Sequence, residues 1–389
     1  MAKEIFEASY SEYIGKKIGN IVVTDYIGEG TMGIVFKGHH KNLGIDVAIK
    51  IIKDELLSSK ADEYLGRFER EARIAARLNH RCITRIIDYG FIENKPYIVI
   101  EYIDGFTLSE FIKACEDDIA EINVLKLIGM IASGLYEAHK NGIIHRDMKA
   151  QNIMISREGR PYITDLGLAR DVADLTITQS SIVMGSPAYM APENFTSEEG
   201  IDLRSDIYSL GCAAYYAAFK QLPVKGGSIK EIINKHINGD IDFGLPTNCG
   251  KETINIIKKM MNANIDERYQ SAQGIVNDIK SVLANREKTA KASKDGIQKK
   301  SATASQEYYT ETMEATSSVS YTDSDSLTGS NVFLNVASVL KVLEERLGPA
   351  ASSHGSINIT HATLKDRMIL WVLLTGLFAC TIIGYLLTS

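Results

Sequence analysis

The spacing of apolar residues along the chain changes at about residue 103. Before this point, apolar residues occur in short runs rich in β-branched side chains. These runs predict strands over residues 20–28, 33–40, 46–52 and 96–103. One stretch, from about Asp62 to Leu78, has helical spacing, and helical spacing dominates from about Leu108 onward, as in residues 122–142. The pattern predicts an α+β fold in which a small β-rich lobe precedes a larger helical lobe.

Residues 286–330 have a different composition. The first part of this segment is basic and polar, and the second part is rich in Ser and Thr. Neither part can bury enough apolar surface to order itself, so we expect a disordered linker. We interpret the basic run as a solvated stretch, and binding to an anionic partner is the alternative.

A short amphipathic helix is expected at residues 331–348. Its apolar residues step by three and four positions, as along a heptad seam. They are Phe333, Val336, Leu340, Leu343 and Leu347. The seam is too short to hold alone in water, so the helix either docks within its own chain or pairs two chains into a homodimer.

Residues 368–387 carry no charged side chain and are long enough to cross about 30 Å of hydrocarbon. A buried core helix is the alternative, but an apolar helix after a disordered linker has no core to enter. We therefore predict a single C-terminal transmembrane helix, reached through a juxtamembrane linker at 349–367. Lys365 and Arg367 flank it, which places the folded region on the cytoplasmic side. Small residues along the span are a second hint of homodimer pairing.

Composition bears on the possible partners of the protein and on the redox state of its cysteines. The chain has 389 residues and a formal net charge of −6, which gives no reason to expect a nucleic-acid partner. Its five cysteines are scattered without a C-x-x-C pair, so we expect reduced thiols. The first residues have no apolar run of the kind that a secretory signal needs.

Three glycines at G-x-G-x-x-G spacing mark the first candidate site: Gly28, Gly30 and Gly33. A Walker A loop would need a Lys-Ser/Thr pair that is missing here. A Rossmann fingerprint would open a helix, whereas a strand follows Gly33. The remaining interpretation is a flap between two strands that closes over the phosphates of a nucleotide.

Residues downstream supply the chemistry that such a flap needs. Lys50, on a predicted strand, can reach the α- and β-phosphates, and Glu71 on the predicted helix could anchor it as an ion pair. Asp147 would accept the proton of an attacking hydroxyl. Asn152 and Asp165 would hold a metal ion between the phosphates.

In chain order, the quoted motifs are VAIK, HRDMKAQN, Asp165-Leu166-Gly167 and Ala191-Pro192-Glu193. Together they resemble the signature set of the Hanks-type (eukaryotic-like) serine/threonine protein kinases. The finer texture, including LNHRCI and ERYQSA, resembles the bacterial membrane-associated members. The resemblance implies a bilobal protein kinase fold over residues 20–285, after an N-terminal leader at 1–19. It also implies ATP, Mg²⁺ with Mn²⁺ as an alternative ion, and protein substrates with Ser or Thr.

The resemblance assigns further roles in the nucleotide site. Ile100 would be the gatekeeper, and the backbone of Glu101 and Ile103 would bond adenine. Val35 and Ala48 would pack on the faces of the base. Other features indicate Ser/Thr substrates: Lys149, which would contact the γ-phosphate, and Gly185-Ser186.

Three residues of the large lobe receive structural roles from the same resemblance. Glu193 and Arg268 would form a buried ion pair, and Asp206 would brace the catalytic loop. Tyr208 stands where the family more often has Trp. Met148, Ala150 and Leu166 also depart from the family pattern, but none of these changes removes a catalytic group. Of the three, Leu166 would alter how the metal-binding triplet packs between active and inactive states, which bears on regulation more than on activity.

The last expectation is that phosphorylation of the activation segment regulates the enzyme. Arg146 would bind a phosphate on the activation segment, and Thr178 and Ser180 are the predicted autophosphorylation sites. Ordinary loop hydroxyls are the alternative for both. A pseudokinase scaffold is the alternative to an active enzyme, although Lys50 and both catalytic aspartates are present.

Overall fold

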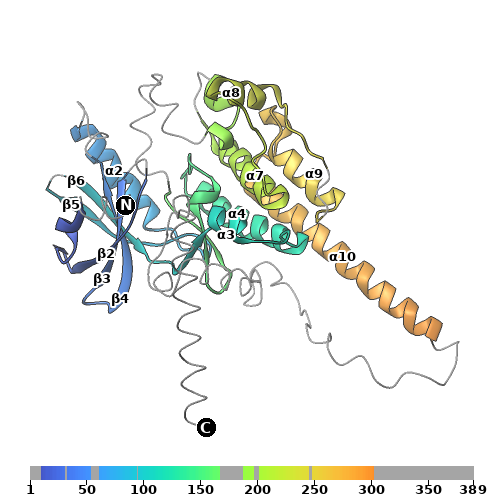
Figure 1. Cartoon of the computed structure of the whole chain (residues 1–389), viewed down its shortest axis with the longest axis horizontal. Helices are drawn as coiled ribbons and strands as arrows, with labels where there is room; N and C mark the ends of the chain where they lie inside the picture. Colours follow the sequence, from blue (N-terminus) through green and yellow to red (C-terminus); the bar gives the residue numbers. More distant parts are fainter. Residues whose placement is uncertain are drawn as a thin grey trace, which may run out of the picture.

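The computed structural model describes residues 10–30, 33–53, 61–93, 95–166, 187–196, 201–244 and 248–301. These residues form two lobes, with a six-stranded sheet and helix α2 (Ala61–Ala75) at one end and the remaining helices at the other (Figure 1). Each lobe has its own cluster of buried apolar residues. The predicted α+β architecture of two lobes is confirmed.

The sheet of the small lobe is antiparallel throughout, with the strand order β1-β2-β3-β4-β6-β5. Its strands are β1 (Lys17–Ile18), β2 (Ile21–Glu29), β3 (Gly33–His40), β4 (Ile45–Ile52), β5 (Ile86–Ile92) and β6 (Lys95–Glu101). Four of these six are the strands that the β-branched runs predicted.

The glycine-rich stretch connects β2 to β3. The backbone N–H of Gly30 donates to the carbonyl of Gly33 at 2.9 Å. A Cβ atom on Gly33 would lie 2.4 Å from the carbonyl oxygen of Ile51 on β4, so no larger residue fits there without moving the sheet. A strand rather than a helix follows Gly33, as the flap interpretation requires and the Rossmann one does not. Its closure over the phosphates of a nucleotide stays a prediction.

The small lobe begins before residue 20, where we predicted that the domain starts. A short 3₁₀ helix, η1 (Ser11–Tyr13), leads into β1. Tyr13 and Ile18 are buried in the small-lobe core, and the ring of Tyr13 lies 5.2 Å from that of Phe36. Two apolar residues five positions apart form no periodic pattern, so this packing could not be predicted from the sequence.

The large lobe is built from helices around the buried helix α7 (Leu203–Phe219). Its longer helices are α3 (Leu108–Ala114), α4 (Glu121–Lys140), α7 (Leu203–Phe219), α8 (Ile229–Asn238), α9 (Lys251–Met260) and α10 (Ala272–Ser301). Shorter pieces complete it: β7 (Gly105–Thr107), β8 (Ile153–Ser156), β9 (Pro161–Ile163), α6 (Glu193–Thr196) and the 3₁₀ turns η3 (Ala150–Asn152), η5 (Pro187–Tyr189) and η6 (Ile265–Glu267). Thr107 and Glu110 form a capping box at the start of α3, which fixes where that helix begins.

Helix α10 differs from the expectation for residues 286–330. It continues to Ser301 and extends past the other helices of the lobe (Figure 1). The first part of the predicted disordered linker is therefore helical. Its Ala, Lys, Glu and Gln residues are good helix formers, so they extend a helix that packing has already started.

No helix among the described residues is both long and apolar enough to span a bilayer. The predicted span at 368–387, the helix at 331–348 and most of the linker lie outside the described residues.

Candidate active site

The predicted catalytic residues lie around the junction of the two lobes. The ammonium group of Lys50 on β4 lies 2.8 Å from Oδ1 of Asp165, which follows β9. This ion pair joins a strand of the small lobe to a loop of the large lobe. Glu71 is half-buried on α2, and its pairing with Lys50 stays a prediction.

Asp147 lies at the centre of a small polar cluster. The ammonium group of Lys149 is 2.8 Å from Oδ2 of Asp147. The amide nitrogen of Asn152 donates to the same oxygen at 3.0 Å and to the backbone carbonyl of Asp147 at 2.8 Å. Both amide hydrogens are thus used, which leaves the amide oxygen of Asn152 as the atom that could bind a metal ion.

Asp206, on the buried helix α7, holds the backbone of this loop. Its carboxylate accepts hydrogen bonds from the backbone N–H of His145 at 2.7 Å and of Arg146 at 2.8 Å. Arg146 has a left-handed backbone, with φ of 62°, which is strained for a residue other than glycine. The bonds to Asp206 offset that strain, so Asp206 lies where the expected brace of the catalytic loop belongs.

Two histidines of the site have no role assigned from the sequence. His145 is buried, its Nε2 lies 2.8 Å from the carbonyl oxygen of Thr164, and its Nδ1 accepts the backbone N–H of Asp147. It thereby joins the Asp147 loop to the residue before Asp165. Nε2 of His139 lies 2.9 Å from Asp206. His145 could have been found from the sequence, because it lies two positions before Asp147 in the same motif. His139 lies on a helix 67 positions before Asp206, and no sequence pattern links the two.

Asp165 is held in its charged form. Burial alone would raise the pKa of Asp165, but the positive charges of Lys50 and Lys149 outweigh burial and hold that pKa below its ordinary value. Its backbone is also left-handed, with φ of 58°. Leu166, the departure from the family's usual Phe, is buried in the large-lobe core.

The donor set suits a magnesium ion that binds together with phosphates. Within the described ranges, no group of three or more His, Cys, Asp or Glu side chains could hold a metal by itself. Asp165 and Asn152 offer one carboxylate and one amide oxygen. Mg²⁺ commonly takes one or two such protein ligands and completes its shell with phosphate oxygens and water.

The residues predicted to surround adenine lie on neighbouring strands. Ala48 on β4 pairs in register with Ile100 on β6, and Val35 on β3 pairs with Lys50. The backbone N–H of Glu101 donates to the carbonyl of Arg85, so its own carbonyl is the group left for a base. Ile103 follows in the connection from β6 to β7.

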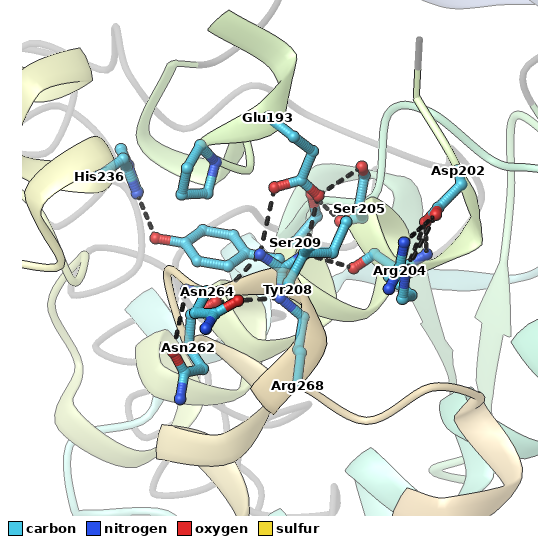
Figure 2. A network of polar contacts seen from close by, with 12 residues as sticks. Glu193, Asp202, Arg204, Ser205, Tyr208, Ser209, His236, Asn262, Asn264 and Arg268 are labelled. Carbon is cyan, nitrogen blue, oxygen red and sulfur yellow. Dashed lines mark hydrogen bonds and ion pairs between the residues drawn. The ribbon is translucent and has the colours of Figure 1, made fainter. Parts of the chain in front are cut away.

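The large lobe contains the predicted ion pair. Nη1 of Arg268 lies 2.7 Å from Oε1 of Glu193, and Nη2 lies 3.1 Å from Oε2 (Figure 2). The arginine side chain is 0% exposed. Burial alone would raise the pKa of Glu193, but Arg268 and the hydroxyl of Ser205 outweigh it and lower that pKa. The carboxylate therefore stays charged, as a buried pair requires.

Some predicted residues lie outside the described ranges. They are Gly167, Thr178, Ser180 and Gly185-Ser186. The phosphorylation sites and the phosphate-binding role of Arg146 therefore stay predictions.

Comparison with known proteins identifies the family of the chain. Residues 21–279 match the protein kinase domain family, and the chain belongs to it. The chain is 35% identical over 277 residues to a probable serine/threonine-protein kinase of Clostridium perfringens, which covers 69% of this chain and 39% of that protein. It is 34% identical over 259 residues to serine/threonine-protein kinase PknB of Mycobacterium tuberculosis, which covers 64% and 40%.

The chain thus spans less than half the length of these two relatives. Among solved structures, the PknI kinase domain of Mycobacterium tuberculosis matches with a TM-score of 0.54 and 21% identity, over 69% of this chain and 98% of that one. This match shows the fold. The family and its bacterial relatives confirm the resemblance that the motifs indicated.

Proposed function

We propose that this chain is an ATP-dependent serine/threonine protein kinase that transfers the γ-phosphate of ATP to protein hydroxyls. The observation that carries the proposal is the convergence of Asp147, Lys149 and Asn152 in one cluster, beside the Lys50–Asp165 ion pair. These are the groups that phosphoryl transfer needs: a proton acceptor, positive charge and metal ligands.

Each residue has a distinct task in this reaction. Asp147 accepts the proton of the substrate hydroxyl, and Asp206 keeps the loop of Asp147 in place. Lys50 and Lys149 stabilise the negative charge that develops on the transferring oxygens. Asp165 and Asn152 would hold Mg²⁺, which neutralises phosphate charge when it is bound.

The test is transfer of labelled γ-phosphate from Mg-ATP to casein. Asp147→Asn should reduce the rate on the order of 10²–10⁴-fold, because the base is lost. Asp240→Asn, at an exposed aspartate after α8, is the matched control and should keep full activity. ATP binding by the wild type without measurable transfer would instead support the pseudokinase scaffold.

We further propose that residues 368–387 anchor the enzyme in a membrane. Support comes from the uncharged sequence of the segment and from Lys365 and Arg367 beside it. Deleting residues 365–389 should move the protein to the soluble fraction, whereas deleting 331–348 should leave it in the membrane fraction. Retention of the first variant in the membrane would contradict the anchor.

Activation by autophosphorylation is the third part of the proposal. Confinement to a surface raises the effective concentration of one kinase against another, which favours modification between chains. Thr178 and Ser180 should carry phosphate in the wild type and lack it in Asp147→Asn, as measured by phosphopeptide mass spectrometry. Labelling confined to the linker, for example at Ser317, would contradict this assignment.

A further inference from the structure

Tyr208 joins two parts of the large lobe that the proposed reaction does not use directly. Its hydroxyl lies 2.7 Å from Nδ1 of His236 on α8, and Cζ of Arg268 lies 4.9 Å from the centre of its ring (Figure 2). Tyr208 and His236 are both 0% exposed. The phenol therefore connects α8 to the buried Glu193–Arg268 pair.

Both partners in this hydrogen bond are neutral at pH 7. Burial raises the pKa of Tyr208 well above its ordinary value and lowers the pKa of His236 to about 4. A neutral imidazole carries one proton, on either Nδ1 or Nε2. If Nδ1 carried it, the Tyr208 hydroxyl would have no acceptor among the described residues. The hydroxyl therefore donates to Nδ1, and the imidazole proton is on Nε2.

Nε2 of His236 is buried. A hydrogen bond with the backbone of Ala188, in the turn η5 (Pro187–Tyr189), raises the pKa of His236 against the larger, opposite effect of burial. Since Nδ1 accepts from Tyr208, Nε2 is the nitrogen that faces Ala188. The buried hydroxyl of Tyr189, in the same turn, contacts the backbone of Ala150. Losing either contact would leave a buried polar group unsatisfied, so the two contacts hold the turn between α8 and the Asp147 loop.

The position of η5 connects it to the substrate. Ala150, which Tyr189 contacts, directly follows Lys149 and is three residues after Asp147, so the turn lies against the loop that would receive the substrate hydroxyl. The turn also directly follows Ser186 and ends four residues before Glu193, which is fixed by Arg268. Its free movement is therefore limited on one side by the ion pair and on the other by α8.

We propose that His236 is a positioning residue for the protein substrate. Its Nε2–H donates to the carbonyl of Ala188 and fixes η5 beside the Asp147 loop, and Tyr208 keeps the imidazole in the tautomer that this bond requires. The inference rests on the proposed kinase function, because its effect appears only in the use of a protein substrate.

The experiment measures KM for casein, KM for ATP and kcat in the full chain. Tyr208→Phe and His236→Asn should raise KM for casein by about 2- to 10-fold, the value of one hydrogen bond, and leave KM for ATP unchanged. The side chain of Asn reaches only the Nδ1 position. His236→Gln places an amide N–H near the Nε2 position and should restore KM for casein.

Tyr215→Phe is the matched control. It removes a hydroxyl from the same helix, where Tyr215 is buried and donates to the carbonyl of Asp242 at 2.7 Å. This variant should leave KM for casein unchanged. An equal rise in Tyr215→Phe and Tyr208→Phe would overturn the proposal, since general loosening of α7 would then explain both.

The other outcomes separate this inference from the proposed function. Unchanged KM for casein in Tyr208→Phe and His236→Asn, with an active wild type, would overturn the inference alone. A wild type that binds ATP but transfers no phosphate would overturn both.

Discussion

Two ion pairs of nearly the same length serve different purposes in this molecule. Lys50 and Asp165 lie 2.8 Å apart at the junction of the lobes, with side chains 12% and 34% exposed. Arg268 and Glu193 lie 2.7 Å apart inside the large lobe, with side chains 0% and 12% exposed. The first pair is partly open to solvent, and the second is enclosed.

The partners of the Arg268 guanidinium and of the Lys50 ammonium explain why the two ion pairs serve different purposes. Arg268 uses all five of its N–H donors, on both oxygens of Glu193 and on the backbone carbonyls of Arg204 and Asn262. Asp165 is the ion-pair partner that the structure gives Lys50. A nucleotide could therefore take over Lys50 and a metal ion Asp165, whereas nothing could replace Glu193 without leaving Arg268 unsatisfied.

The largest expected effect on stability follows from Arg268. Arg268→Met should lower the free energy of unfolding by about 3–5 kcal/mol, because it leaves Glu193 buried without a counter-charge. Urea unfolding followed by circular dichroism measures this. Arg157→Met, which breaks a half-exposed pair with Asp104, is the control and should cost about 0.2–1 kcal/mol.

Replacing both members of the buried pair sharpens the comparison. The double variant Glu193→Leu and Arg268→Met should be more stable than Arg268→Met alone, because no buried charge then remains. A double variant that is less stable than the single one would show that the ion pair itself, rather than the stranded charge, dominates.

For Lys50 we expect a large loss of activity and a small loss of stability, the opposite of the result for Arg268. Lys50→Met should lower kcat on the order of 10²–10³-fold, as the loss of one group that stabilises transition-state charge does elsewhere. The free energy of unfolding should change by less than about 1 kcal/mol, because Asp165 keeps access to water. Labelled phosphate transfer and urea unfolding of the same sample test both. Parallel loss of stability and activity would contradict the distinction between the two pairs.

The sequence predicted these catalytic residues because each stands beside a local pattern. Lys50 lies within a β-branched run, and Asp147 and Asn152 lie five positions apart after a helix that stops at a glycine. The structure preserves patterns of this kind because they depend on neighbouring residues of one segment and not on how distant segments pack. Four of the six small-lobe strands were predictable for the same reason.

Contacts between distant segments had no such signal. Tyr208 and His236 are 28 positions apart, and their bond depends on how α7 and α8 pack. The length of α10 was missed because polar composition reports on burial, whereas helix continuation depends on propensity and on the packing of residues such as Ile275 and Ile279. Both errors come from reading one local property as if it decided tertiary structure.

Lowering the pH should weaken the buried Glu193–Arg268 pair. The pKa of Glu193 is held below its ordinary value of 4.5, so its contribution to stability is present above that pH and is lost as pH falls toward the folded-state pKa. Each unit of depression is worth about 1.4 kcal/mol. The difference in unfolding free energy between wild type and Glu193→Gln should therefore shrink as pH falls below about 5. A constant difference between pH 7 and pH 3.5 would mean that Glu193 is not charged in the fold.

The smallest effect is expected for a third ion pair, which lies between the two extremes. Arg286 on α10 donates to both carboxylate oxygens of Glu121 on α4, each at 2.7 Å, with side chains 35% and 18% exposed. Arg286→Met should lower the unfolding free energy by about 0.2–1 kcal/mol, near the upper end because the contact is bidentate. Lys140→Met, which breaks an exposed pair with Glu137 at 3.4 Å, should lower it less. If Arg286→Met instead approached the loss of Arg268→Met, exposure would not be what separates these pairs, and the fixed geometry between α4 and α10 would have to account for the energy.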